Sequence, residues 1–202
     1  MMQREANNQA QIATIPTQIQ ALFHATVQAG AAIAAWQRPG MTQPQAVVDL
    51  SATPTLATVD FAARQPAFVF APFVAAPAGA ALQHNPDLWF DGQTLHLLNS
   101  NGSLARAQHA ENLLRALDAG DANVKPSWYV AETIRNRAAT EEEFTGIVQH
   151  AIDFIRTTGI AKVVVSRTAA LPLPANFDPA ITFATLCARY PHAFVSLVAI
   201  PG

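Results

Sequence analysis

Apolar residues recur at intervals of three and four in four stretches of the chain, each with a helix start or stop signal. These stretches are residues 15–28, 104–119, 140–158 and 178–190. Such spacing places the apolar side chains on one face of a helix, where they can be buried together. The pattern therefore predicts four amphipathic helices.

Runs of β-branched and aromatic residues between these helices predict the strands. Asp91-Gly92 separates two such runs, which is typical of a tight hairpin. The predicted strands lie within residues 31–37, 45–50, 67–70, 88–97, 161–171 and 192–200.

The stretch from residue 140 to 171 carries the clearest local signals. Thr140-Glu141-Glu142-Glu143 is a capping box, because Thr140 can cap the helix and Glu143 can reach back to it. Three glutamates also suit the positive end of the helix dipole, so we interpret them as a solvated first turn rather than as metal ligands. Gly159 ends the helix, and the predicted strand follows at once.

A lysine, Lys162, lies at the start of this strand beside three valines that indicate burial. Alternation along a strand places Lys162 on one face with Ser166 and Thr168. A buried ammonium is costly unless it is paired or its pKa is lowered. The alternative is a lysine at a strand edge, with its stem packed and its head in water. Taken by itself, the strand favours this alternative.

Composition narrows the classes of protein to which the chain can belong. Half of its 202 residues are apolar and 13% are charged, which is enough to build a sizeable core and argues against disorder. A net charge of −2 without a basic cluster argues against nucleic acid and anionic membranes as partners. Residues 1–13 lack the apolar core of a signal peptide, and the apolar run at 67–82 is too short to span a bilayer. We therefore expect a cytoplasmic protein.

Cysteine and histidine are the remaining candidates for chemistry. The single cysteine, Cys187, cannot form an internal disulfide, which suits a reducing compartment. Its position in the apolar pattern of a helix predicts a small core residue. His84 and His96 have no paired metal-ligand spacing, so we interpret both as surface or strand-face histidines.

Beyond a polar boundary at residues 121–139 the chain carries a series of short motifs. They are Lys162-Val163-Val164-Val165-Ser166-Arg167, Asp178-Pro179, Tyr190-Pro191-His192-Ala193-Phe194-Val195 and Pro201-Gly202, with Ala67-Phe68-Val69-Phe70-Ala71-Pro72-Phe73 and Asp87-Leu88-Trp89-Phe90 upstream. In these motifs the chain resembles the start of the chorismate-binding domain of isochorismate synthases, which belong to a family of chorismate-using enzymes with anthranilate, aminodeoxychorismate and salicylate synthases. The resemblance covers about residues 65–202 and implies an amino-terminal α+β region at 1–130 and an incomplete chorismate-binding domain at 131–202.

The resemblance implies an α+β fold of mostly antiparallel sheets packed with outer helices, of which this chain holds part. It also implies a role for Lys162, because members that add water to chorismate carry lysine there and ammonia-using members usually carry glutamine. Lys162 would be the general base that activates the water attacking C2 while the C4 hydroxyl leaves, giving isochorismate for menaquinone or siderophore biosynthesis. Ser166 and Arg167 fit the motif with structural roles, Arg167 as an ion-pair partner.

Other parts of the family's site have no counterpart in this sequence. The family carries its acid glutamate, and the glutamates that hold Mg²⁺, beyond a Gly-x-Ser-Pro-Glu segment that follows the Pro-Gly turn. The resemblance therefore implies a fragment that lacks its metal ligands and is inactive alone, from an enzyme that is a monomer at full length. Two alternatives stay open: a salicylate synthase-like or other chorismate-using enzyme, and a non-catalytic truncated paralogue that acts as a binding or assembly module.

Overall fold

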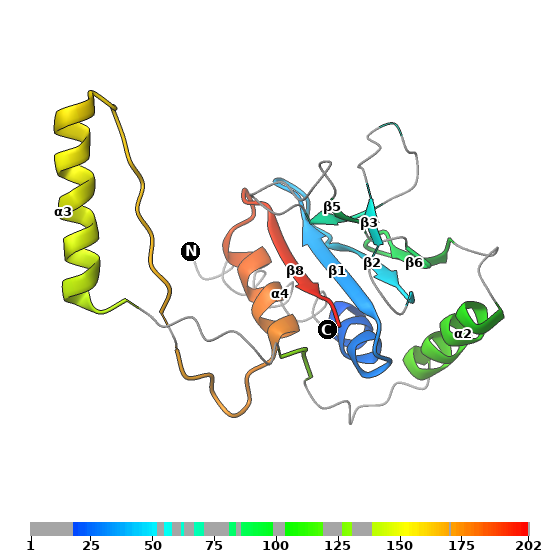
Figure 1. Ribbon diagram of the computed structural model, residues 1–202. Coiled ribbons are helices and arrows are strands. Elements are labelled where there is room, and N and C mark those ends of the chain that lie inside the picture. Colours follow the sequence, from blue (N-terminus) through cyan, green and yellow to red (C-terminus); the bar gives the residue numbers. More distant parts are fainter. Residues whose placement is uncertain are drawn as a thin grey trace, which may run out of the picture. The chain divides into compact units, whose positions relative to one another are not determined.

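The structure is a computed structural model that divides into two compact units (Figure 1). The first unit comprises Met1–Val130 and Asn176–Gly202, and the second comprises Ala131–Ala175. The residues that the structure describes are 18–51, 55–57, 62, 67–70, 81–83, 86–98, 104–118, 127–130, 139–169 and 171–201.

A five-stranded antiparallel sheet is the centre of the first unit. Its strands are β1 (Ala32–Gln37), β2 (Gln45–Asp49), β6 (Leu88–Phe90), β7 (Leu95–Leu97) and β8 (Val195–Ala199), in the spatial order β7-β6-β2-β1-β8. Ile33 of β1 is aligned with Val48 of β2 on one side and with Ala199 of β8 on the other. Among the described strands the last, β8, therefore lies beside the first, β1, as the red and blue arrows in Figure 1 show.

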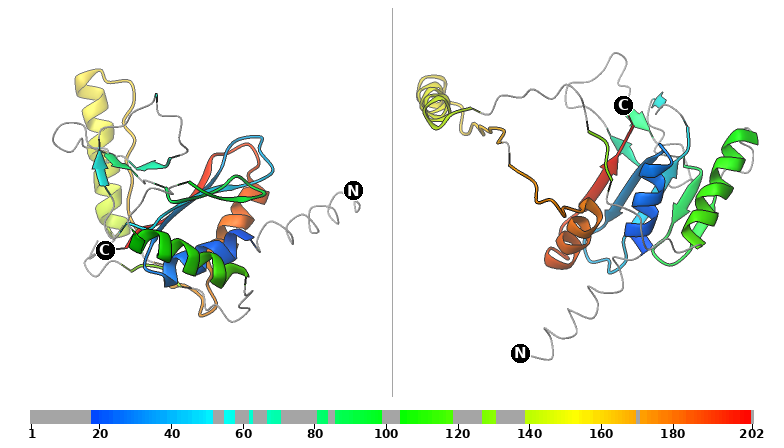
Figure 2. Two further views of the ribbon diagram at one scale, coloured as in Figure 1. Left: turned by 90° about the vertical axis from the view of Figure 1, so that its right-hand side faces the viewer. Right: turned by 90° about the horizontal axis from the view of Figure 1, so that it is seen from below.

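Three helices pack on one face of this sheet (Figure 2). They are the amino-terminal helix, described over residues 18–28, α2 (Leu104–Asp118) and α4 (Pro179–Arg189). Alternate residues of each strand point toward the helices, because side chains of a strand alternate between faces. The core that results joins all three helices to the sheet and includes Phe23, Ile33, Val48, Leu88, Phe90, Ala110, Leu113, Phe183, Cys187 and Val195.

A second sheet of three short strands belongs to the same unit. Its strands are β3 (Thr55–Ala57), β5 (Ala81–Gln83) and β4 (Val69–Phe70), in the order β3-β5-β4. The Trp36 ring, on the face of β1 opposite to Ile33 and Ala35, lies 5.7 Å from the ring of Phe68, next to β4. β3 and β5 lie outside the strands that the residue pattern predicts.

The expectation of an α+β chain with four helices and mostly antiparallel strands is confirmed for the described residues. The fourth helix is α3 (Glu141–Thr158) of the second unit. The predicted hairpin is also confirmed, because β6 pairs with β7 and residues 91–94 connect them. Gly92 suits this connection, since its φ of 107° disfavours other residues and a Cβ atom there would lie 2.8 Å from the Cβ of Gln43.

The strand predicted at residues 161–171 is wrong for the described residues in that range, 161–169 and 171. Valine favours strands because it fits a pleated surface that is half buried by neighbours. No described strand pairs with this segment, and Val163 and Val164 are 39% and 77% exposed. High β-propensity alone therefore did not produce a strand here.

Among the helices in the described part of the chain, none combines the length and the apolar composition that crossing a bilayer requires.

Leu88 and Leu97 provide a test of where the core lies, because they face each other in the β6–β7 pair but differ in burial. Leu88 is fully buried, whereas Leu97 is 55% exposed. We expect Leu88→Ala to lower the free energy of unfolding by about 2–5 kcal/mol, because it leaves a cavity in the core. Leu97→Ala should change it by about 0.5 kcal/mol or less. Urea denaturation measures both, and equal losses would contradict the described packing.

Candidate functional site

The predicted base, Lys162, belongs to the second unit and follows α3. The capping box at the start of α3 is confirmed: the Glu143 N–H donates to Thr140 Oγ1 at 3.2 Å, and the Thr140 N–H donates to Glu143 Oε2 at 2.8 Å. The predicted stop at Gly159 is confirmed by its left-handed φ of 73° and its N–H bond to the Ile155 carbonyl. Local signals therefore define both ends of this helix.

Arg167 joins the segment after α3 to the start of the helix. Its Nη1 donates to the Ala139 carbonyl oxygen at 3.4 Å, and its guanidinium lies 5.8 Å from the centre of the Phe144 ring. Both contacts are structural, because they hold residues 161–169 beside the helix from which they follow. The expected ion pair is not found for Arg167 among the described residues, where an aromatic ring and a carbonyl are its partners.

Lys162 itself is exposed. Val163 and Val164 are exposed as well, and α3 contributes no buried residue. The second unit by itself therefore does not supply the desolvation that we expected from the valines. Ser166 and Thr168, which alternation would place beside Lys162, are also exposed.

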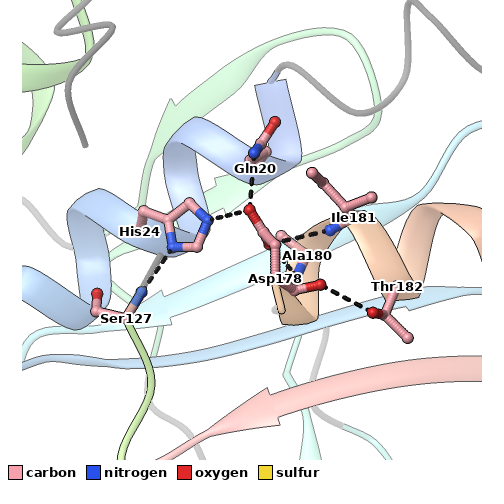
Figure 3. Close-up of polar contacts among 7 residues, drawn as sticks. All are labelled: Gln20, His24, Ser127, Asp178, Ala180, Ile181 and Thr182. Carbon is pink, nitrogen blue, oxygen red and sulfur yellow. Dashed lines mark hydrogen bonds and ion pairs between the residues drawn. The ribbon is translucent and has the colours of Figure 1, made fainter. Parts of the chain in front are cut away.

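A different group of polar residues is buried in the first unit and draws on distant parts of the sequence (Figure 3). His24 and Asp178 have side chains that are 2% and 3% exposed, and His24 Nε2 lies 3.0 Å from Asp178 Oδ2. Gln20 Nε2 donates to the same carboxylate oxygen at 2.8 Å. The Ser127 N–H donates to His24 Nδ1 at 3.4 Å.

These contacts assign the proton of His24. Nδ1 accepts the Ser127 N–H, so in the neutral ring the proton resides on Nε2 and is donated to Asp178. The other carboxylate oxygen of Asp178 accepts the N–H groups of Ala180 and Ile181, at 2.8 and 3.1 Å, and thereby caps α4. The predicted cap at Asp178, with proline at the first helical position, is confirmed.

The pKa of Asp178 reflects opposing effects. Burial raises the pKa of the carboxyl group, but hydrogen bonds from His24, the Ile181 N–H and Gln20 outweigh burial and leave the pKa below its ordinary value of 3.8. The carboxylate is therefore stabilised in its charged form, and each of its partners is a donor.

Pattern-based reasoning found one half of this cluster and missed the other. Asp178 was visible as a helix cap, but nothing near it in the sequence indicates His24. The available signal was weak: Gln20 and His24 are polar residues four positions apart in an apolar helix, so they share a face. Such a pair indicates a buried polar contact without naming its partner.

A second polar cluster attaches α2 to the sheet. Arg106 Nη2 lies 2.7 Å from Asp87 Oδ2 and 3.6 Å from Asp49 Oδ1, and both carboxyl side chains are nearly fully buried. The Leu50 N–H also donates to Asp87 Oδ2, at 2.7 Å. We interpret this cluster as structural, because one guanidinium and the backbone at the end of β2 satisfy the carboxylates.

The remaining candidates have structural environments. Cys187 is confirmed as a core residue, and burial raises the pKa of its thiol to about 11, which disfavours the nucleophilic thiolate. His96 lies on β7, 2.8 Å from Asp91 Oδ2 and stacked on Trp89, as expected for a strand-face histidine. His84 lies outside the described residues. Within the described ranges, no three His, Cys, Asp or Glu side chains are grouped so that they could hold a metal ion.

Comparison with models of known protein families, with curated proteins and with solved structures finds no match for this chain.

Asp178 generates a prediction for stability and its dependence on pH. Asp178→Asn should lower the free energy of unfolding near neutral pH by about 1–3 kcal/mol, because the amide nitrogen would face donors whichever way it turns: His24 and Gln20, or the N–H groups at the start of α4. A carboxyl group whose pKa is lowered by folding stabilises above its unfolded pKa and loses this effect as the pH falls through the folded value. The difference between the two proteins should therefore shrink as the pH falls below 3.8.

Urea denaturation at a series of pH values measures this difference. Asp153→Asn is the matched control, because Asp153 is an exposed residue of α3 and should change stability little at any pH. A difference between Asp178→Asn and the unchanged protein that stays constant below pH 3.8 would contradict the lowered pKa.

Proposed function

We propose that this chain is the amino-terminal part of an isochorismate synthase in which Lys162 is the general base. The observation that carries the proposal is the motif Lys162-Val163-Val164-Val165-Ser166-Arg167 between a box-capped helix and an Asp178-capped helix. The order of α3, α4 and β8 supports it as well, although the lysine segment, expected as a strand, forms none in its described part.

The proposed reaction adds water at C2 of chorismate and expels the C4 hydroxyl, with the ring double bonds shifting between them. Lys162, as a neutral amine, takes a proton from the attacking water, because water is a poor nucleophile. The C2–O bond forms, the C4–O bond breaks, and the departing hydroxyl takes up a proton from the family's acid glutamate, which has no counterpart in this sequence. Mg²⁺, when bound, neutralises the substrate carboxylate, but the described residues do not form a site for it.

The exposure of Lys162 limits the conditions under which its amine can act as a base. An ammonium in water holds its proton, so Lys162 becomes a base only where other groups desolvate it or a nearby cation repels its charge. In the described unit neither the valines nor α3 covers it. The proposal therefore assigns Lys162 to a site that this chain supplies only in part.

A non-catalytic binding or assembly module is the second candidate. The observation that favours it is the apolar surface of the second unit, where Ile147, Phe154 and Val164 are 46%, 51% and 77% exposed. Exposed apolar side chains of this size are typical of surfaces that other protein elements cover. This candidate needs no deprotonated Lys162, so activity separates it from the enzyme.

The function is tested with chorismate and Mg²⁺, on this chain and on any longer protein that the reading frame encodes past codon 202. We expect no isochorismate from the 202 residues alone and turnover from the longer protein. Lys162→Gln should lower kcat by about 100-fold to 10,000-fold, because the amide cannot accept the proton of water. Lys125→Gln, at the chain's other lysine, is the matched control and should leave kcat unchanged.

Each outcome separates the candidates. Isochorismate produced by the 202 residues alone would contradict a site supplied only in part. Full activity in Lys162→Gln would contradict the role of Lys162. A reading frame that stops at codon 202, with no turnover, would favour the binding module.

A further inference from the structure

The chain passes from the first unit to the second and back, and the residues on either side of this excursion meet at the amino-terminal helix. Ser127–Val130 precede the second unit, and Asn176–Asp178 follow it. His24 contacts both segments: its Nδ1 accepts the Ser127 N–H, and its Nε2 donates to Asp178 (Figure 3). One buried ring therefore connects the outgoing chain to the returning chain.

One further contact joins the two segments to each other, and another joins the outgoing segment to Val27 and Ala31. The ring of Trp128 meets that of Phe177 edge to face, with 5.5 Å between their centres. The Tyr129 hydroxyl donates to the Ala31 carbonyl at 2.8 Å and lies 3.2 Å from that of Val27. Burial raises the pKa of this hydroxyl, so it remains a donor. All of these residues belong to the first unit.

We propose that His24, Ser127 and Asp178 form a latch that keeps the two crossing points of the chain together. The latch holds together the two segments that flank residues 131–175 in sequence. All of its contacts come from the first unit. The segment that follows Asp178 continues directly into α4, whose first turn Asp178 caps. Opening separates the segments 127–130 and 176–178 as one event and leaves the five-stranded sheet paired.

The latch would exist whichever reaction the protein catalyses, because none of its residues belongs to the proposed catalytic site. Its three members are joined in series through one imidazole, with Trp128 and Phe177 in direct contact beside it. Loss of either hydrogen bond of His24 should therefore loosen both segments. Two independent contacts would instead loosen one segment each.

Two substitutions of His24 each remove one of the two hydrogen bonds of its ring and retain the other. The amide oxygen of an asparagine can replace Nδ1 as the acceptor for Ser127, and the amide nitrogen of a glutamine can replace Nε2 as the donor to Asp178. His24→Asn thus retains the outgoing contact and loses the returning one, and His24→Gln does the reverse. Hydrogen exchange, measured by mass spectrometry on the full chain, follows peptides that cover residues 127–130 and 176–182.

We expect exchange in both peptides to be at least about tenfold faster in each variant, with peptides covering β1 and β2 unchanged. Phe177→Leu removes the ring contact with Trp128 and leaves His24 unchanged. It should also speed exchange in both peptides, so it serves as the test if the His24 variants do not fold. His96→Gln, at the exposed His96–Asp91 pair, is the control and should leave both peptides unchanged.

The proposal is overturned if each variant loosens only the segment whose contact it removes. It is also overturned if exchange rises equally in β1 and β2, because the contact would then stabilise the whole unit rather than the two flanking segments.

Discussion

The pairing of β1 with β8 is the contact on which the first unit depends. β1 lies between β2 and β8, so its backbone is hydrogen-bonded on both edges, and its residues Ile33, Ala34 and Ala35 are completely buried. β8 is separated from β1 by more than half of the sequence, so this pairing joins two distant parts of the chain. α4 precedes β8 directly, so the pairing also delivers Phe183 and Cys187 to the core.

A second contact between distant parts of the first unit is polar. His24 and Asp178 form it, and the buried carboxylate accepts hydrogen bonds from the ring, from Gln20 and from the first turn of α4. A buried carboxylate would be costly alone, but here both of its oxygens accept hydrogen bonds. Asp178 thereby caps α4 and joins α4 to the amino-terminal helix.

The second unit differs from the first in its packing. Its helix, α3, has a complete capping box and a left-handed stop, but it buries no residue, and the valine-rich segment after it forms no strand in its described part. Most helices in proteins gain stability mainly from the packing of an apolar face. Under the proposed function this exposure has a consequence, because Lys162 acts as a base only where other groups desolvate its amine or a nearby cation repels its charge.

The sequence by itself determined the features that depend on a few neighbouring residues. Thr140 and Glu143 cap α3, Asp178 and Pro179 begin α4, and Asp91-Gly92 lies in the connection of a hairpin, because each signal acts within one turn of the chain. Only the tertiary structure decided which distant elements meet: His24 with Asp178, and β1 with β8. It also decided that residues 161–169 form no strand, since a strand requires a partner whose position no local propensity can specify.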